Sequence, residues 1–267
     1  MSELVLDQPL RPLLELIEVT LDTSPHSDPD NVVGLPLGPL TCGFDAASIT
    51  GLIGIAGAGR AALVDLITGV ALPASGVIRI GGLRIDRLGP AERTRLGVLA
   101  MRRQRLVPAD TLAGMLATAR SMVSHRWWRL AFGLASGPSS TDREDVAAIL
   151  TFLGLTDAAD RPVAGLAGLQ ARLAELARCL VQRPRLLVLE QPLAGLAADD
   201  RTTMARLLVR LRRANVTLIV VDDDLATLGR LADRCLVLHR GRLIADATPA
   251  AIGAASHVFQ ALTGSTL

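Results

Sequence analysis

The stretch of sequence that decides the fold is GIAGAGRAA, from Gly54 to Ala62. Gly54 and Gly59 are separated as in a phosphate-binding loop of the form GxxxxGKS or GxxxxGKT, and Gly57 lies between them. A working loop of this kind wraps its backbone N–H groups around phosphates. The glycine spacing therefore predicts the scaffold of a nucleotide site.

The side chains of this loop depart from the working pattern. A functional loop uses its Lys to reach the outer phosphates and its Ser or Thr hydroxyl to bind Mg²⁺. Here Arg60 takes the Lys position, and Ala61 and Ala62 take the two hydroxyl positions. Every basic residue of the chain is Arg, so no Lys is available elsewhere in the chain to contact a phosphate. Arg60 has two interpretations: its guanidinium contacts phosphate, which it suits geometrically, or it fills the empty cradle and pairs with Glu190 or Asp223.

The segments around the loop give it the required setting. Ile49–Ile53 is a buried strand candidate that runs straight into the glycines. Ala61–Thr68 has the apolar spacing of a helix, and Gly69 follows it as a C-cap. A strand, a glycine turn and a helix in this order are the context that a phosphate loop needs.

Further along, apolar runs of strand length alternate with amphipathic segments. This alternation predicts an α/β fold with a mainly parallel sheet. A loop or hairpin region is expected over residues 22–39. Residues 105–165 show helical signals and contain no strong strand candidate. Other strands are expected at Leu14–Leu21, Gly76–Ile85 (a hairpin), Leu186–Leu189, Val216–Val221, Leu236–His239 and Arg242–Ile244. Other helices are expected at Thr111–Val123, Asp142–Phe152, Gln170–Leu180, Thr202–Arg213 and Leu225–Ala232.

Composition limits the function classes. The 267 residues are 50% hydrophobic, which is enough to bury the core of one large domain. The formal charge is only +2, so nothing indicates a nucleic-acid-binding face. The three cysteines are widely spaced and predict neither a disulfide framework nor a metal site. No apolar run approaches the roughly 20 residues of a membrane span, and we expect a cytoplasmic protein.

Several segments together resemble one family, the ATP-binding subunits of ABC transporters, and most closely those of branched-chain amino-acid importers. The resemblance covers roughly residues 14–255. It is carried, in chain order, by Gly54–Gly69, Pro73–Ile85, Arg105–Pro108, Leu166–Leu196, Ala232–Gly241 and Ala245–Pro249. It implies a P-loop NTPase core of ABC type, α/β with a mainly parallel sheet, antiparallel β elements and an inserted helical subdomain. The implied divisions are a leader (1–13), the core in two parts (14–104 and 166–250), the helical subdomain (105–165) and a C-terminal segment (251–267).

In this family two such domains sandwich two ATP molecules, each held between the phosphate loop of one chain and the Leu-Ser-Gly-Gly-Gln signature of the other. The matching stretch here is Leu166-Ala167-Gly168-Leu169-Gln170. Ala167 replaces the phosphate-bonding Ser, and Leu169 replaces the second Gly. A bulky side chain there would crowd the partner's nucleotide, because glycine allows close approach of the backbone.

The remaining family positions are altered in the same way. Glu190 replaces the Walker B Asp, and Gln191 replaces the Glu that polarises the attacking water, leaving an amide without useful basicity. Asp223 replaces the switch His and would repel a γ-phosphate. Gln104 is nearest to the Q-loop glutamine, although Arg102 or Arg103 are alternatives for that place. No catalytic position is intact, and no metal ligand set is predicted.

The resemblance implies a degenerate ABC subunit, a pseudo-ATPase that binds ATP weakly if at all. It would act with a transmembrane permease and a second ATP-binding subunit, as a homo- or heterodimer, on the inner face of the cell membrane. Two alternatives stay open: an active ATPase that energises import of amino acids or similar solutes, and a soluble regulatory protein that uses the ABC fold. The role of Mg²⁺ is left open.

Overall fold

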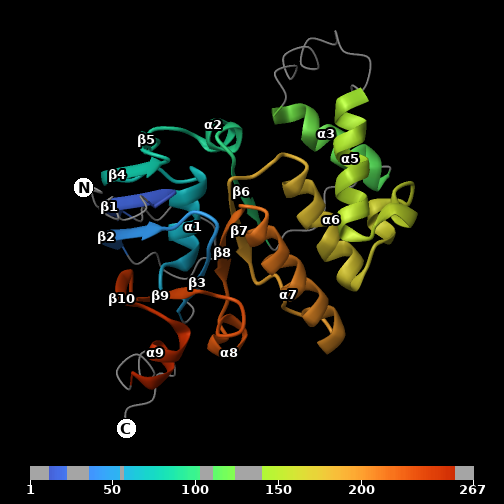
Figure 1. Cartoon of the computed structure of the whole chain (residues 1–267). Coiled ribbons are helices and arrows are strands. Elements are labelled where there is room, and N and C mark those ends of the chain that lie inside the picture. Colours follow the sequence, from blue (N-terminus) through green and yellow to red (C-terminus); the bar gives the residue numbers. More distant parts are fainter. Residues whose placement is uncertain (1–11, 23–35, 55–56, 103–110, 124–139, 256–267) are drawn as a thin grey trace, which may run out of the picture.

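Two β-sheets form the framework of the molecule, and helix α1 (Arg60–Thr68) packs between them (Figure 1). The computed structural model describes residues 12–22, 36–54, 57–102, 111–123 and 140–255. The smaller sheet is antiparallel in the order β2-β1-β4-β5. Its strands are β1 (Leu14–Leu21), β2 (Leu37–Phe44), β4 (Ser75–Ile80) and β5 (Leu83–Arg84).

The larger sheet has the order β10-β9-β3-β8-β7-β6. Five of its strands pair in parallel, and β10 closes one edge antiparallel to β9. The strands are β3 (Ile49–Ile53), β6 (Val98–Met101), β7 (Leu186–Glu190), β8 (Thr217–Val221), β9 (Arg234–His239) and β10 (Arg242–Ala247). The carboxyl ends of β3, β7 and β8 meet at one edge of this sheet, which is where ligands bind in parallel α/β folds.

The central strands of the larger sheet are buried on both faces, and their side chains alternate between two cores. Leu187 and Leu189 of β7 join the core shared with the helices, whereas Leu186 and Val188 join the core around α1. This alternation follows from the period of two along a strand. It also explains why the central strands read as uninterrupted apolar runs.

Helices pack against the other face of the larger sheet and at its β6 end. Helices α3 and α5 stand beside α6, to one side of the sheet (Figure 1). The helices besides α1 are α2 (Pro90–Arg95), α3 (Leu112–Val123), α5 (Ser140–Leu153), α6 (Gly168–Leu180), α7 (Ala198–Arg213), α8 (Leu225–Leu228) and α9 (Pro249–Ala254), with short 3₁₀ turns at Thr156–Ala158 and Val163–Gly165. None of the helices in the described ranges combines the length and apolarity that crossing a bilayer would require.

The predicted fold class is confirmed, and three details of the sequence interpretation need correction. The region expected as a loop or hairpin over residues 22–39 ends in a strand, because β2 begins at Leu37 and pairs antiparallel with β1. The helix expected over Leu225–Ala232 ends at Leu228. Strand β6 and the short helices α2 and α9 were not predicted. All three are four to six residues long, and segments of that length carry too little periodicity to detect.

Candidate functional site: a phosphate loop closed by an internal ion pair

The glycines of the loop adopt backbone conformations that other residues rarely reach. Gly57 and Gly59 have φ angles of +79° and +96°, and Gly59 is the N-cap of α1. A Cβ atom on Gly54 would lie 2.5 Å from the Leu238 carbonyl oxygen. The loop thus needs glycine at these positions, which fits the shape of a phosphate cradle at a helix N-terminus. Ile55 and Ala56 lie outside the described residues.

Arg60, the first residue of α1, forms an ion pair with Asp223. The guanidinium nitrogen Nη1 contacts the carboxylate oxygen Oδ1, and the two side chains are 16% and 56% exposed. Of the two partners proposed for Arg60 from the sequence, the structure therefore shows Asp223. The carboxylate supplies the negative charge that a phosphate would bring to a cation at this position.

Gln191 completes the network from the neighbouring strand. Its amide Nε2 donates to Asp223 Oδ2 at 3.0 Å, so both carboxylate oxygens have a partner. Its backbone N–H donates to the Val221 carbonyl at 2.8 Å, and its φ angle is +46°. Asp223 thus joins Arg60 and Gln191 in one network within a single chain.

The sequence named Gln191 and Asp223 but did not predict the hydrogen bond between them. A usable signal was present, because each follows a buried strand, β7 or β8. These strands pair in parallel with Glu190 opposite Val221, which brings the residues after them together. An amide and a carboxylate at adjacent strand ends form a hydrogen bond readily.

The donor set at the loop does not fit Mg²⁺. This ion takes oxygen ligands in octahedral geometry, and the methyl side chains of Ala61 and Ala62 offer none. Ala62 instead packs against the core around α1. Glu190 is half-buried at the end of β7. Within the described ranges, no group of three or more His, Cys, Asp or Glu side chains is placed to hold a metal ion.

The other two carboxylates of the Asp222–Asp224 run accept hydrogen bonds from backbone N–H groups. Asp222 Oδ1 accepts from the N–H groups of Asp223 and Asp224 at 2.8 and 3.1 Å. Burial raises the pKa of Asp222, and repulsion from its two acidic neighbours acts in the same direction. Asp224 caps α8 by accepting from Ala226 N, Thr227 N and the Thr227 hydroxyl. The hydrogen bond from that hydroxyl is the main cause that lowers the pKa of Asp224.

The signature stretch lies at the start of α6. Ala167 is the N-cap and makes no side-chain cap hydrogen bond, and Gly168 has a φ angle of +54°. Leu169 is half-buried and packs against the core shared with the helices, a contact that the sequence argument about crowding did not include. Gln170 is exposed and accepts from Arg161 Nη1 at 3.3 Å. A hydroxyl that could bind phosphate is missing from this helix start, because the usual Ser is Ala167.

The expected Q-loop residue Gln104 lies outside the described residues, as does Arg103. Arg102 follows β6 and forms an ion pair with Asp65 of α1. It also donates to the Thr68 hydroxyl at 3.3 Å. Arg102 therefore ties the end of β6 to α1.

Residues 37–194 match the family described as ABC transporter. This chain belongs to the ABC transporter family.

Three similar proteins of known description are also ATP-binding proteins of transport systems. BraF of Pseudomonas aeruginosa, a high-affinity branched-chain amino acid transport ATP-binding protein, is 32% identical over 225 residues, which cover 81% of this chain and 87% of BraF. LivG of Escherichia coli K12, with the same description, is 30% identical over 227 residues with the same coverage. The ribose import ATP-binding protein RbsA of Cereibacter sphaeroides is 30% identical over 195 residues, 73% of this chain and 37% of RbsA.

Solved structures confirm the ABC fold. A nucleotide-free ATP-binding cassette from an ABC transporter superposes with a TM-score of 0.80 at 20% identity, covering 95% of this chain and 99% of the cassette. The ADP conformation of an ATP-binding cassette gives the same values. The order of strands and helices described above is thus that of an ABC ATP-binding cassette.

Proposed function

We propose that this chain is the ATP-binding-type subunit of an ABC importer in which its own nucleotide site has lost its catalytic chemistry. As a pseudo-ATPase it completes the ABC dimer with a second ATP-binding subunit and couples that dimer to a membrane permease. The contact of Arg60 with Asp223, shared with Gln191, is the observation that carries this proposal. It joins three altered positions into one network that needs no nucleotide.

The chemistry of these positions supports loss of hydrolysis. Phosphoryl transfer depends on positioning and on neutralising charge at the transferred group. Gln191 cannot act as a base, Ala61 offers no oxygen to a metal, and Asp223 adds negative charge where a phosphate would come. Loss of one acid–base contribution costs about 10²–10⁴ in rate. ATP binding is accordingly weak, through the loop backbone, and largely independent of Mg²⁺.

The helical region supports a permease partner. An apolar hollow of about 390 Å³ lies between α3 and α5. Its lining includes Ala113, Ala117, Val146 and Leu150, and Arg143 is the one charged residue among the described lining residues. Such a hollow suits a short helix of a membrane subunit that inserts an apolar side chain. We propose that residues 105–165 form the helical subdomain between core parts 14–104 and 166–250, and that the chain works at the inner face of the membrane.

The cargo is proposed from the relatives alone. BraF and LivG are named for branched-chain amino acid transport. An amino acid or a similar small solute is therefore the proposed class, and the permease partner selects it.

The test measures ATP binding and phosphate release by the purified chain, with and without Mg²⁺. The expected dissociation constant for ATP is higher than the cellular ATP concentration and does not change with Mg²⁺. The expected rate of phosphate release equals that of a protein-free sample. Mixing in a competent ABC subunit as a positive control shows that the assay detects turnover. Mg²⁺-dependent turnover by this chain alone would contradict the proposal and favour the active ATPase.

A further inference from the structure

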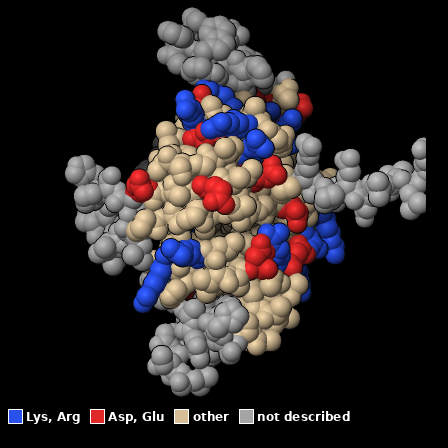
Figure 2. Space-filling model, turned by 90° about the vertical axis from the view of Figure 1, so that its left-hand side faces the viewer, with Lys and Arg blue, Asp and Glu red and all other residues tan. Residues whose placement is uncertain are grey.

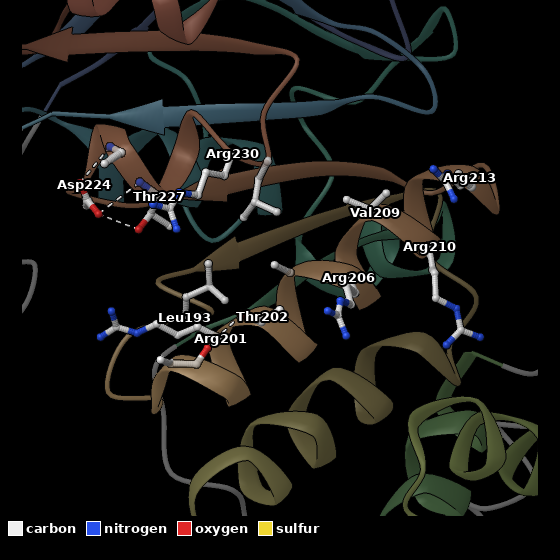
Figure 3. Close-up of a pocket in the computed structure, with 14 residues that line it drawn as sticks. Leu193, Arg201, Thr202, Arg206, Val209, Arg210, Arg213, Asp224, Thr227 and Arg230 are labelled. Atoms are coloured by element: carbon white, nitrogen blue, oxygen red, sulfur yellow. Dashed lines mark hydrogen bonds between the residues drawn. The ribbon is translucent and has the colours of Figure 1, made fainter.

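An arginine-rich hollow lies between α7 and the α8 region, apart from the nucleotide loop. It has a volume of about 930 Å³. Figure 3 shows its lining residues, with side chains from along α7 and with Asp224, Thr227 and Arg230 from the α8 side. Five of the lining residues are arginines: Arg201, Arg206, Arg210, Arg213 and Arg230. All five are exposed.

The positive charge of this hollow is only partly balanced within the described part of the chain. Among the described lining residues the one carboxylate is Asp224, which interacts with the charge of Arg230 and already accepts three hydrogen bonds as the cap of α8. The ion pairs between described residues engage other arginines, including Arg212 on the same helix, which pairs with Asp233. Arg210 lies over the Phe152 ring, 4.4 Å from its centroid. The whole chain carries only +2, so this concentration of one sign is local.

Another face of the molecule shows the contrast. In Figure 2 acidic and basic side chains are interspersed and separated by broad uncharged areas. Mixed signs of this kind are ordinary for a soluble surface. Concentrated like charge lowers stability through repulsion and is typical of a surface that binds the opposite charge.

The spacing of the arginines describes the shape of the ligand. Arg206, Arg210 and Arg213 are four and three residues apart and therefore share one stripe of α7. From Arg206 to Arg213 the helix rises about 10 Å, at 1.5 Å per residue, and Arg201, five residues before Arg206, lies off this stripe. A single phosphate or a small metabolite would reach only part of this row. An elongated ligand with repeated negative charges would reach all of it.

The floor of the hollow narrows the chemistry further. This floor is formed by aliphatic side chains, Leu193, Ala205, Val209 and Leu231 among them, and no aromatic ring is among the described lining residues. Single-stranded nucleic acid is usually bound by stacking bases on aromatic side chains, which this floor does not offer. A flat bilayer surface does not fill a hollow. Aliphatic and acidic side chains on one segment match both the floor and the arginines.

We infer that this hollow binds an acidic, amphipathic segment of a partner protein. Its carboxylates meet the arginines of α7 and Arg230, where the guanidinium fork suits bidentate contacts. Its apolar side chains lie on Val209 and Leu231. This inference is independent of whether the nucleotide site is active.

The experiment measures fluorescence anisotropy of a labelled peptide with the full chain. The peptide has about 16 residues, long enough to form helix, with Glu at i, i+4 and i+7 and Leu on the adjoining stripe. A matched peptide carries Gln in place of every Glu. We expect the acidic peptide to bind, binding to weaken with salt, and the Gln peptide to bind at least about tenfold more weakly.

Two variants with the same change in charge locate the binding. The double variant Arg206→Glu with Arg230→Glu alters both walls of the hollow. The control, Arg79→Glu with Arg87→Glu, alters two exposed arginines elsewhere. We expect the first to weaken acidic-peptide binding by about tenfold or more and the control to change it less than about twofold. If the first variant does not fold, Arg201→Gln with Arg206→Gln replaces it, with an expected weakening of about threefold.

Three outcomes would overturn the inference. Equal affinity of the hollow variant and the control would place binding elsewhere. Equal affinity of the Glu and Gln peptides would remove the role of charge. Binding of a single-stranded RNA oligonucleotide or of vesicles containing anionic phospholipid, without binding of the acidic peptide, would assign the arginines to nucleic acid or to the membrane.

Discussion

An arginine side chain lies at each end of helix α1, one from α1 itself and one from α2. The two guanidinium groups contact different kinds of partner. At the start of the helix, Arg60 contacts the side chain of Asp223. At the other end, Arg93 from α2 donates to backbone carbonyl groups, including Ile67 at 3.0 Å and Leu66. Arg60 is 16% exposed and lies at the candidate site, whereas Arg93 is fully buried.

The difference separates support of the fold from chemistry at the site. The carbonyls at the last turn of a helix lack partners within the helix, so Arg93 meets a need of the fold. Its donors also reach the Leu88 and Ile85 carbonyls at 2.9 and 2.8 Å. Burial lowers the pKa of Arg93 to about 10, which still leaves it charged at neutral pH. Asp223 is a side chain, so the pairing at Arg60 changes with one substitution and need not disturb the backbone.

The largest effect is expected from Arg93→Met. The substitution removes the donors to four buried carbonyl groups, and the free energy of unfolding should fall by about 3–5 kcal/mol. For a chain of this size, that corresponds to a melting temperature lower by roughly 10 °C. Thermal unfolding followed by circular dichroism measures the shift. Arg87→Met, an exposed arginine in the same segment, is the control and should change stability by less than about 0.5 kcal/mol. A melting temperature equal to that of Arg87→Met would refute the assigned role of Arg93.

A smaller effect on stability, but a change in binding, is expected from Asp223→Asn. It removes the charge that pairs with Arg60 and leaves the guanidinium available to a phosphate. ATP binding without Mg²⁺ should become about tenfold tighter, equivalent to about 1.4 kcal/mol. Stability should change by less than about 1 kcal/mol because Asp223 is more than half exposed.

Titration calorimetry with ATP measures this change. Asp157→Asn removes an exposed carboxylate from a distant 3₁₀ turn and controls for net charge. If both variants bind ATP with equal affinity, the Arg60–Asp223 ion pair does not weaken ATP binding. The proposed functional role of the contact at the start of α1 would then be wrong.

How far sequence reasoning reached can be seen at particular elements. The strand Ile49–Ile53, the helix after it and its Gly69 cap were predicted closely, because long apolar runs and glycine punctuation report backbone geometry directly. Gly69 has a φ angle of +80°, and a Cβ there would lie 2.9 Å from Arg93 Nε. The burial of Arg93 itself was not predicted, since its carbonyl partners come from two separate segments, the end of α1 and the turn Ile85–Leu88.

The sequence named the residues of the candidate site but did not predict the contacts between them. Arg60 was expected to pair with Glu190 or Asp223, and the choice depended on side-chain directions at the end of β8 that no sequence pattern encodes. The arginines of α7 recur at helical spacing, which indicates one face. That face borders a hollow because the α8 region packs opposite α7. The sequence pattern of α7 alone could not predict this tertiary contact.

The smallest effect is expected from Asp224→Ala. This variant tests whether Asp224 only stabilises the fold as the cap of α8, while Asp223 alone acts at the candidate site. Loss of the α8 cap should lower the free energy of unfolding by about 1 kcal/mol at pH 7. The pKa of Asp224 is lowered in the folded state, mainly by the Thr227 hydroxyl. Its contribution is therefore present above the unfolded pKa, near 4, and is lost as pH falls through the folded value.

Urea unfolding of wild type and Asp224→Ala between pH 7 and pH 3 measures this contribution. The gap between the two proteins should shrink below about pH 4, because the wild-type cap becomes protonated there. Asp224→Asn is the matched variant: Asn also caps helices well, so it should keep most of the stability at pH 7. ATP binding by both variants should equal that of wild type, since Asp223 and Arg60 are untouched. A gap that stays constant down to pH 3 would mean that the carboxylate charge of Asp224 does not hold α8. A change in ATP binding would mean that the acidic run acts as one unit, with no division between Asp223 and Asp224.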